Sequence, residues 1–260
     1  MMNQLLTPDA RTHDQQLNGS GSVASPGAPT VSALSEVAAP GVAAPEFAPP
    51  AFLVVLDVDS TLIENEVIEM LAECAGSLDE VAHITERAMS GELDFQQSLR
   101  SRVSTLAGLP VACFGEVAAS IRVTDGADEL VAGLHAAGGY VGVVSGGFHE
   151  LVDDVALSLG LDFWSANRLE VADGVLTGTL VGPVIDAEAK ASALVAWAAA
   201  AGIPLVRTVA VGDGANDLRM MHTAGLSVAF NAREVVRSAA HLSIDTRDLS
   251  QLLPLLGLRG

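Results

Sequence analysis

Lysine is nearly absent from this chain: of its 13 basic residues 12 are arginine, and the one lysine is Lys190. Basic residues are also few as a group, because 32 acidic residues oppose them and give a formal net charge of −19. Nucleic acids and anionic membrane surfaces bind proteins through lysine and arginine side chains, so this charge balance argues against both as partners.

Cysteine is scarce as well. Cys74 and Cys113 are too few for a disulfide framework and lack the spacing of metal ligands. We interpret both as reduced thiols in the core, which is typical of a cytoplasmic protein. The first residues contain no basic segment followed by an apolar one, and the densest apolar run, 193–201, is about half as long as a membrane helix. The sequence therefore predicts a soluble protein of the cytoplasm.

The composition changes near residue 50. Seven of the 11 prolines lie before this point, among alanine, glycine and serine. Such a segment buries too little apolar surface to offset the entropy lost on ordering, so we predict a disordered tail over residues 1–50. The chain as a whole is 50% hydrophobic and 17% charged, which is typical of a folded protein with a sizeable core.

Beyond the tail, strands and helices alternate. The apolar run 51–57 predicts a buried parallel strand, and Asp173-Gly174 predicts the turn of a hairpin over 169–182. Further strands are expected over 140–145, 208–211, 226–230 and 242–244, and helices over 125–137, 147–159, 186–201 and 216–224. This alternation indicates an α/β fold, a Rossmann-like doubly wound parallel sheet with right-handed crossovers.

A helical segment interrupts this alternation. Residues 65–122 contain three predicted amphipathic helices, the first of which ends at Gly76. We therefore predict a core domain formed by residues 51–64 and 123–260, with a small helical domain over 65–122 inserted after the first strand.

Acidic and hydroxyl side chains follow the first strand in the sequence Asp57-Val58-Asp59-Ser60-Thr61. Residues two apart on a strand point to the same face, so Asp57 and Asp59 can project into one site. Two carboxylates held together require a cation or a shared proton. The alternative is a turn whose Asp and Ser side chains cap the next helix.

Two later motifs also follow predicted strands. Ser145-Gly146-Gly147 combines a hydroxyl with glycines that let an anion approach the backbone, although such turns also occur without function. The run from Asp213 to Asp217 places two acids four residues apart in a glycine-rich turn, which suits Mg²⁺ bound together with a phosphate. A plain turn with a helix cap at Asn216 is the alternative there.

Lys190 lies on the predicted helix that precedes the third motif. A compact ammonium charge suits a phosphoryl oxygen, and the alternative is an exposed lysine retained by chance. Together, the motifs provide an aspartate nucleophile, a cation site, a lysine and a second carboxylate for proton transfer. These groups are sufficient for phosphoryl transfer through an aspartyl-phosphate.

The motifs DVDST, SGG, a single lysine and GDGAND, in this order, resemble the haloacid-dehalogenase (HAD) superfamily, and residues 65–122 resemble its helical cap domain. Segments such as TERAMSGELDFQQSLRSRV and VAVGDGANDLRMMHTAGL are similar to the phosphoserine phosphatase family, along nearly all of residues 52–250. The resemblance implies Mg²⁺-dependent hydrolysis of O-phospho-L-serine to L-serine and phosphate through an aspartyl-phosphate. This reaction would be the last step of serine biosynthesis, performed in the cytoplasm by a monomer or homodimer.

The resemblance also implies roles for individual core residues. Asp57 would be the nucleophile and Asp59 the general acid and base. Mg²⁺ would be held by the Asp57 carboxylate, the Asp59 main-chain carbonyl and Asp213, with Asp217 as a supporting acid. The phosphoryl group would be bound or oriented by Ser145, the Gly146 backbone, Lys190 and Asn216.

In the cap, the resemblance assigns Glu66 to the substrate ammonium and Arg102 to its carboxylate. Glu66 also begins a helix, where the helix dipole favours an acid whatever the function. Phe95 could line the pocket, although spacing alone favours a core residue. His149 and His222 show no partner pattern, and we interpret both as ordinary helix residues.

Other functions remain open at this point. A relative could act on another small phosphate ester, or transfer the phosphoryl group from phosphoserine to homoserine. A phospho-accepting signalling domain also uses an aspartate, Mg²⁺ and a lysine, but the inserted domain and Asp59 argue against it. A binding module without catalysis is disfavoured because no expected catalytic position is substituted.

Overall fold

The computed structural model describes residues 51–259, and the tail predicted over residues 1–50 lies outside this range. Within it, seven strands form one sheet in the order β4-β3-β2-β1-β5-β6-β7. All neighbouring strands are parallel except β3 and β4, which are antiparallel. The strands are β1 Leu53–Leu56, β2 Tyr140–Phe148, β3 Phe163–Ala172, β4 Val175–Val181, β5 Thr208–Gly212, β6 Leu226–Phe230 and β7 Leu242–Ile244.

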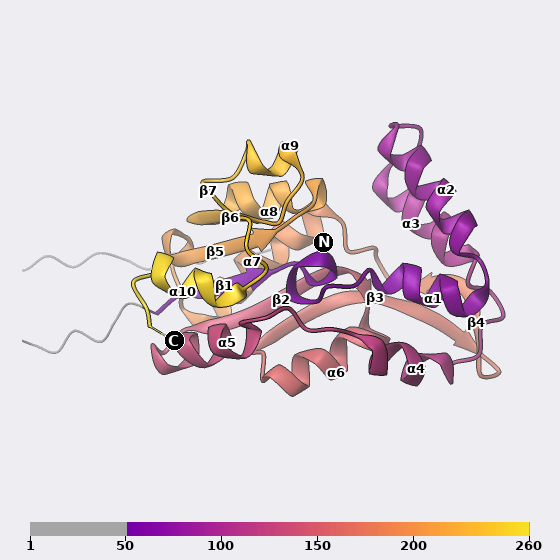
Figure 1. Cartoon of the computed structure of the whole chain (residues 1–260), viewed down its shortest axis with the longest axis horizontal. Helices are drawn as coiled ribbons and strands as arrows, with labels where there is room; N and C mark the ends of the chain where they lie inside the picture. Colours follow the sequence, from indigo (N-terminus) through magenta and orange to yellow (C-terminus); the bar gives the residue numbers. More distant parts are fainter. Residues whose placement is uncertain (1–50, 260) are drawn as a thin grey trace, which may run out of the picture. The chain divides into compact units, whose positions relative to one another are not determined.

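Helices cover both faces of this sheet (Figure 1). Helices α5 (Ala127–Ala136) and α6 (His149–Leu159) pack on one face, and α7 (Ala187–Ala201) and α8 (Leu218–Thr223) pack on the other. Strand β1 lies at the centre of the sheet. It is buried throughout, because its side chains alternate between the two faces and helices cover both. Val54 contributes to one core cluster and Val55 to the other. The predicted doubly wound α/β fold is therefore confirmed.

Residues 65–122 form four helices, α1 Val67–Ala75, α2 Leu78–Met89, α3 Phe95–Ser104 and α4 Cys113–Ser120. Helix α1 ends at Gly76, whose φ of 69° is the left-handed conformation expected of a glycine at a helix end. Helix α4 was not predicted, since it is short and contains a glycine. Cys74 is exposed, contrary to the prediction of a core thiol, because it lies off the buried stripe of α1; Cys113 is buried.

The predicted hairpin is formed by β3 and β4. Its turn residues Asp173 and Gly174 both have positive φ, which matches the right-handed twist of the strands. The turn reaches the inserted helices, where Val111 N–H donates to the Gly174 carbonyl at 3.0 Å and Pro110 pairs with Val175. The hairpin thus supports the inserted segment from outside it in the sequence.

Two boundaries differ from the prediction. Strand β2 continues through Ser145-Gly146-Gly147 to Phe148, whereas a turn and a helix from residue 147 were expected. Its pairing with β3 shifts register between Val144 and Phe148, so the glycines form an extended bulge. The short helix η3 (Ala215–Asp217) precedes α8, where one helix was expected over 216–224.

Short elements complete the described part of the chain: the turn η1 Val58–Leu62, the helices η2 Leu205–Arg207, α9 Glu234–Arg237, η4 Leu249–Gln251 and α10 Leu252–Leu255. Among the helices of residues 51–259, none combines the length and the apolar character that a bilayer crossing requires.

Candidate active site

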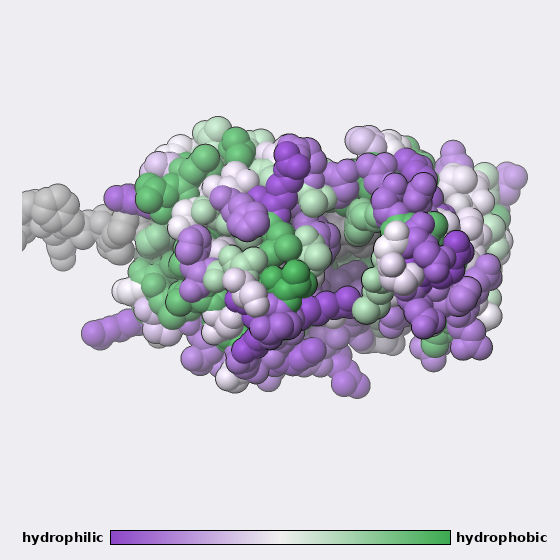
Figure 2. All heavy atoms as spheres, turned by 90° about the horizontal axis from the view of Figure 1, so that it is seen from above, coloured by the Kyte–Doolittle hydropathy of each residue, from purple (hydrophilic) through white to green (hydrophobic). Residues whose placement is uncertain are grey.

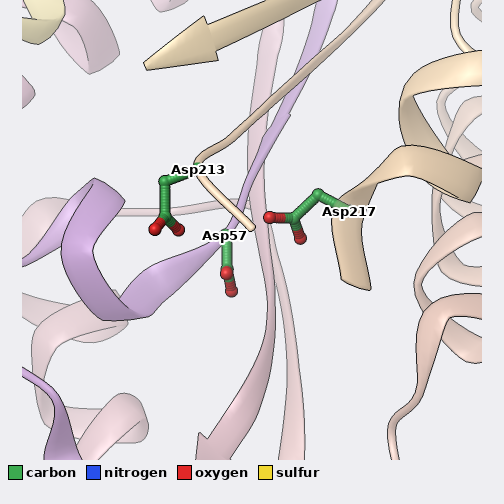
Figure 3. Close-up of side chains that lie close together, drawn as sticks. All are labelled: Asp57, Asp213 and Asp217. Carbon is green, nitrogen blue, oxygen red and sulfur yellow. The ribbon is translucent and has the colours of Figure 1, made fainter. Parts of the chain in front are cut away.

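Three carboxylates lie together at the carboxyl ends of β1 and β5. These strands pair in parallel with Leu56 opposite Val211, so the chain leaves both strands at the same edge of the sheet. One oxygen from each of Asp57, Asp213 and Asp217 lies within 4.8 Å of the others. Figure 3 shows Asp57 between the other two side chains, which come from the segment after β5. The structure therefore brings together acids from two of the three sequence motifs.

Lys190 projects from α7 into this cluster. Its Nζ lies 2.7 Å from an oxygen of Asp57 and 2.7 Å from an oxygen of Asp217, and the residue is fully buried. Burial alone lowers the pKa of the Lys190 ammonium, but the charges of Asp217 and Asp57 outweigh burial and leave the pKa raised. The alternative of a chance, exposed lysine is wrong.

Asp217 is held by the protein on both of its oxygens. One oxygen accepts from Lys190 and the other accepts from the Gly214 N–H at 3.1 Å. A Cβ on Gly212 would collide with this carboxylate, so a glycine is required there. These contacts leave Asp217 suited to positioning Lys190 rather than to binding an ion directly.

The cluster carries more negative charge than Lys190 balances. Burial, together with the charges of Asp57 and Asp217, raises the pKa of Asp213 to about 7. Burial and the Asp57 charge raise the pKa of Asp217 to about 6, although Lys190 opposes the shift. Carboxylates whose pKa values rise in this way are stabilised by an added cation, and all the ligand atoms are oxygens. The residues present thus fit a hard divalent cation such as Mg²⁺.

Asp59 lies in η1, two residues after Asp57. Its φ and ψ of −63° and 133° are extended rather than helical. Its Oδ1 atom is buried and has no hydrogen-bond partner within residues 51–259. Burial, followed by the charges of Glu66 and Asp57, holds the pKa of Asp59 well above its ordinary value. Asp59 is therefore suited to carrying a proton.

The bulge of β2 places Ser145 near Asp59, since atoms of both side chains lie within 3.5 Å of where a Gly147 Cβ would be. Ser145 is fully buried, and its Oγ accepts the Gly147 N–H at 2.8 Å. Because this bond uses an acceptor site of Oγ, the hydroxyl proton of Ser145 is available to a phosphoryl oxygen. A Cβ on Gly147 would lie 2.7 Å from Val67 Cγ2 and 3.5 Å from Asp59 Oδ2, so the absence of a side chain lets α1 and Asp59 approach the strand.

Asn167 of β3, which the sequence analysis did not single out, holds the bulge from the other side. Its Nδ2 donates to the Gly146 carbonyl at 2.9 Å, and its Oδ1 accepts the Ile185 N–H at 2.8 Å. The residue is buried, as an amide with both ends satisfied can be. Asn167 thus connects the glycine bulge with the segment that leads into α7 and Lys190. Its one sequence signal is an amide within an otherwise strand-like segment.

A cavity of about 740 Å³ opens over the carboxylates, between them and the inserted helices. Figure 2 shows a hollow whose rim carries both hydrophilic and hydrophobic residues. Of the predicted site residues, the wall contains Asp57, Asp59, Glu66, Arg102, Gly146, Asp213 and Asn216. Phe95 packs against the core and also lines the cavity, 3.2 Å from where a Gly146 Cβ would be. Arg233, which the sequence did not single out, lines it too.

Glu66 faces the cavity from the start of α1. Its side chain makes no capping hydrogen bond to the helix, and one oxygen accepts the Ser60 hydroxyl at 2.7 Å. Burial raises the pKa of Glu66, while the Ser60 hydrogen bond opposes the rise. Because the carboxylate makes no hydrogen bond to the helix end, a favourable interaction with the helix dipole does not by itself account for an acid at this position.

Arg102 faces the same cavity from the last turn of α3. Its Nε is buried and has no hydrogen-bond partner in the described part of the chain. Burial lowers the pKa of the guanidinium, and Glu66 partly offsets this effect. An unpaired buried donor of this kind is stabilised by an anionic acceptor entering the cavity. Arg100 is exposed and lines a separate groove with Asp94 and Arg219.

His149 differs from its sequence interpretation. Its Nδ1 contacts Asp153 at 2.6 Å, and its Nε2 accepts the Ala166 N–H at 3.2 Å. Asp153 also accepts the Trp164 indole N–H at 2.8 Å. The group ties α6 to β3, so the prediction that His149 has no partner is wrong, and its role is structural.

Comparison with known proteins agrees with this geometry. The family model of the haloacid dehalogenase-like hydrolases matches residues 54–222. A phosphoserine phosphatase from Streptomyces coelicolor is 54% identical over 79% of this chain and 50% of its own length. One from Streptococcus thermophilus is 52% identical over 78% of this chain and 95% of its own length. The chain thus spans about half of the first relative and nearly all of the second.

Solved structures give the same result. A substrate-bound phosphoserine phosphatase complex is 44% identical, with a TM-score of 0.75 over 79% of this chain and 98% of that one. A phospho-aspartyl intermediate analogue of a phosphoserine phosphatase is 45% identical, with a TM-score of 0.75 over 79% of this chain and 99% of that one. Within the haloacid dehalogenase-like hydrolases, the chain belongs to the phosphoserine phosphatase family.

Proposed function

We propose that this chain hydrolyses O-phospho-L-serine to L-serine and phosphate, as the last step of serine biosynthesis in the cytoplasm. One observation carries the proposal. On the core side of the cavity, Asp57 is paired with Lys190, an arrangement suited to phosphoryl transfer. On the side of the inserted helices, the cavity is lined by one acidic and one basic side chain, Glu66 and Arg102. Those two charges complement the ammonium and carboxylate of an amino acid whose phosphate lies against Asp57.

In the first half-reaction, a carboxylate oxygen of Asp57 attacks phosphorus and the bond from phosphorus to the serine oxygen breaks. Asp59 donates its proton to that oxygen, which leaves as the serine hydroxyl. The buried position and raised pKa of Asp59 favour the protonated form that this step requires. The product on the enzyme is the aspartyl-phosphate of Asp57.

In the second half-reaction, Asp59, now ionised, accepts a proton from water as the water oxygen attacks phosphorus. The bond from phosphorus to the Asp57 oxygen breaks, which releases phosphate and restores both acids. Ser145, the Gly146 backbone and Asn216 would hold the phosphoryl oxygens, and the buried Lys190 keeps a positive charge beside the Asp57 carboxylate throughout.

Mg²⁺ is the proposed cofactor. The Asp57 carboxylate, the Asp59 main-chain carbonyl and Asp213 would hold it, with Asp217 supporting Lys190. When bound, the ion neutralises negative charge on the transferring phosphoryl group.

The proposal is tested by phosphate release from phosphoserine, with and without Mg²⁺, alongside other small phosphate esters and homoserine as an acceptor. Arg102→Ala should raise KM for phosphoserine by more than about tenfold, because a charged hydrogen bond to the substrate carboxylate is lost. The matched control is Arg100→Ala, an exposed arginine two residues away on α3. Efficient hydrolysis of another ester with none of phosphoserine would refute the proposal.

A further inference from the structure

Ser60 has a backbone conformation that serine rarely adopts. Its φ is 58° and its ψ is 2°, which is the left-handed region that glycine occupies without strain. Asp173 and Asn231 are the other non-glycine residues with positive φ within residues 51–259. Asp173 belongs to the hairpin turn and asparagine tolerates this region, whereas Ser60 lies in η1, at a position that glycine would fill without strain. An interaction of the Ser60 side chain therefore accounts best for the residue at this position.

The side chain of Ser60 makes one such interaction. Its Oγ donates to Glu66 Oε1 at 2.7 Å. Ser60 belongs to the core turn η1, whereas Glu66 is the residue from which α1 of the inserted segment starts. The intervening loop is held in place, because Ser60 N–H donates to the Asn65 carbonyl at 3.2 Å and Glu64 N–H donates to the Arg122 carbonyl at 2.8 Å. The serine hydroxyl thus spans the junction between core and cap.

Glu66 depends on this contact for its orientation. Its side chain makes no capping bond to α1, and within residues 51–259 the Ser60 hydroxyl is its one hydrogen-bond donor. A glutamate side chain has several rotatable bonds, and fixing it costs entropy that a hydrogen bond to the charged group offsets. Because Ser60 occupies one carboxylate oxygen, the other oxygen is left for a ligand in the cavity that Glu66 lines.

We propose that Ser60 is a positioning residue for recognition of the substrate amino group. Its hydroxyl holds the Glu66 carboxylate in place to receive the α-ammonium. This inference rests on the proposed function, in which Glu66 pairs with that ammonium. It predicts that loss of the hydroxyl weakens turnover of esters that carry an ammonium group and spares esters that lack one.

The experiment compares Ser60→Gly and Ser60→Ala with the wild type on three esters. Phosphoserine carries both charged groups, phosphoethanolamine keeps the ammonium alone, and 3-phosphooxypropanoate keeps the carboxylate alone. Glycine relieves the backbone strain and alanine retains it, so an effect shared by both variants belongs to the hydroxyl. Ser77→Ala is the matched control, because its hydroxyl contacts Thr105 at 3.2 Å, away from the residues that line the cavity.

We expect kcat/KM to fall by about tenfold or more in both Ser60 variants for phosphoserine and phosphoethanolamine, the loss typical of a hydrogen bond to a charged group. For 3-phosphooxypropanoate, both variants should match the wild type. An equal loss on all three esters, or no loss on any, would overturn the role of Ser60 while leaving the proposed function intact. A wild type that does not prefer phosphoserine over 3-phosphooxypropanoate would overturn the role of Glu66 and this inference together. A wild type inactive on phosphoserine would refute the proposed function itself.

Discussion

Removing the Lys190 ammonium is expected to destabilise the fold and abolish activity together. Lys190→Met keeps the length and apolar stem of the side chain and deletes the charge that lies 2.7 Å from both Asp57 and Asp217. Breaking a buried ion pair by removing one partner costs about 3–5 kcal/mol, because the remaining charge is left uncompensated. Here two carboxylates lose the same partner, so the upper part of that range is expected for the free energy of unfolding.

The assay is urea denaturation of the metal-free protein at about pH 8 and about pH 5. The destabilisation should be larger at the higher pH, since Asp217, whose pKa is raised to about 6, is ionised there, and it should shrink as Asp217 takes up a proton toward pH 5. The matched control is Arg219→Met, whose partner Glu188 is exposed, as is Arg219 itself. Loss of such a surface pair costs about 0–1 kcal/mol.

Lys190→Arg tests the shape of the site separately from its charge. The wild-type side chain is fully buried, so the larger guanidinium requires the neighbouring groups to move, at about 1–3 kcal/mol. We expect kcat to fall by more than about tenfold, because the Asp57 carboxylate moves with them. A Lys190→Met variant no less stable than the Arg219→Met control, or a fully active Lys190→Arg variant, would refute the reasoning.

Three further predictions concern the metal, the bulge and its support. The pKa values of Asp213 and Asp217, about 7 and about 6, lie above the ordinary carboxyl value. The metal-free protein should therefore gain stability as the pH falls from about 8 to about 5, and lose it as the pH rises through those pKa values. Mg²⁺ should raise the unfolding temperature mainly at the higher pH, and a larger effect at the lower pH would contradict this. Asn167→Ala should lower kcat by about tenfold, because the Gly146 carbonyl and the Ile185 N–H lose their partners. The comparison is Asn65→Ala, which loses one bond to the Arg122 N–H. Kinetics at saturating phosphoserine would detect the fall in kcat. Gly147→Ala should lower kcat/KM more than Gly115→Ala, whose added Cβ meets nothing within 4 Å, and equal activity of the two variants would count against the close approach to Val67.

The sequence was sufficient to predict the parallel sheet and to predict that its motifs meet at one edge of that sheet. Asp57 and Asp213 follow strands that proved to be parallel neighbours, so their meeting required only the rule that carboxyl ends share one edge. The extended course of Gly146 and Gly147 was not predictable in this way. It depends on a register shift against β3 and on Asn167, whose two partners lie 21 and 18 residues away in the chain.

The same limit applies to side chains whose meaning depends on a distant neighbour. Phe95 has the spacing of a core residue, and only the position of Gly146 against it makes it part of a cavity wall. His149 and Ser60 likewise acquire their roles from Asp153 and Glu66. A pattern in the sequence predicts which face of an element is buried, but it does not predict which polar groups meet across two elements.

The central claim is that Asp57 is the nucleophile that phosphoserine phosphorylates. The most direct test is rapid acid quenching of the enzyme during turnover of phosphoserine labelled at phosphorus, followed by mapping of the labelled peptide. Label is expected on the peptide that contains Asp57, and none is expected in an Asp57→Asn variant. Label on a different residue, or phosphate release by the Asp57→Asn variant at the wild-type rate, would contradict the claim.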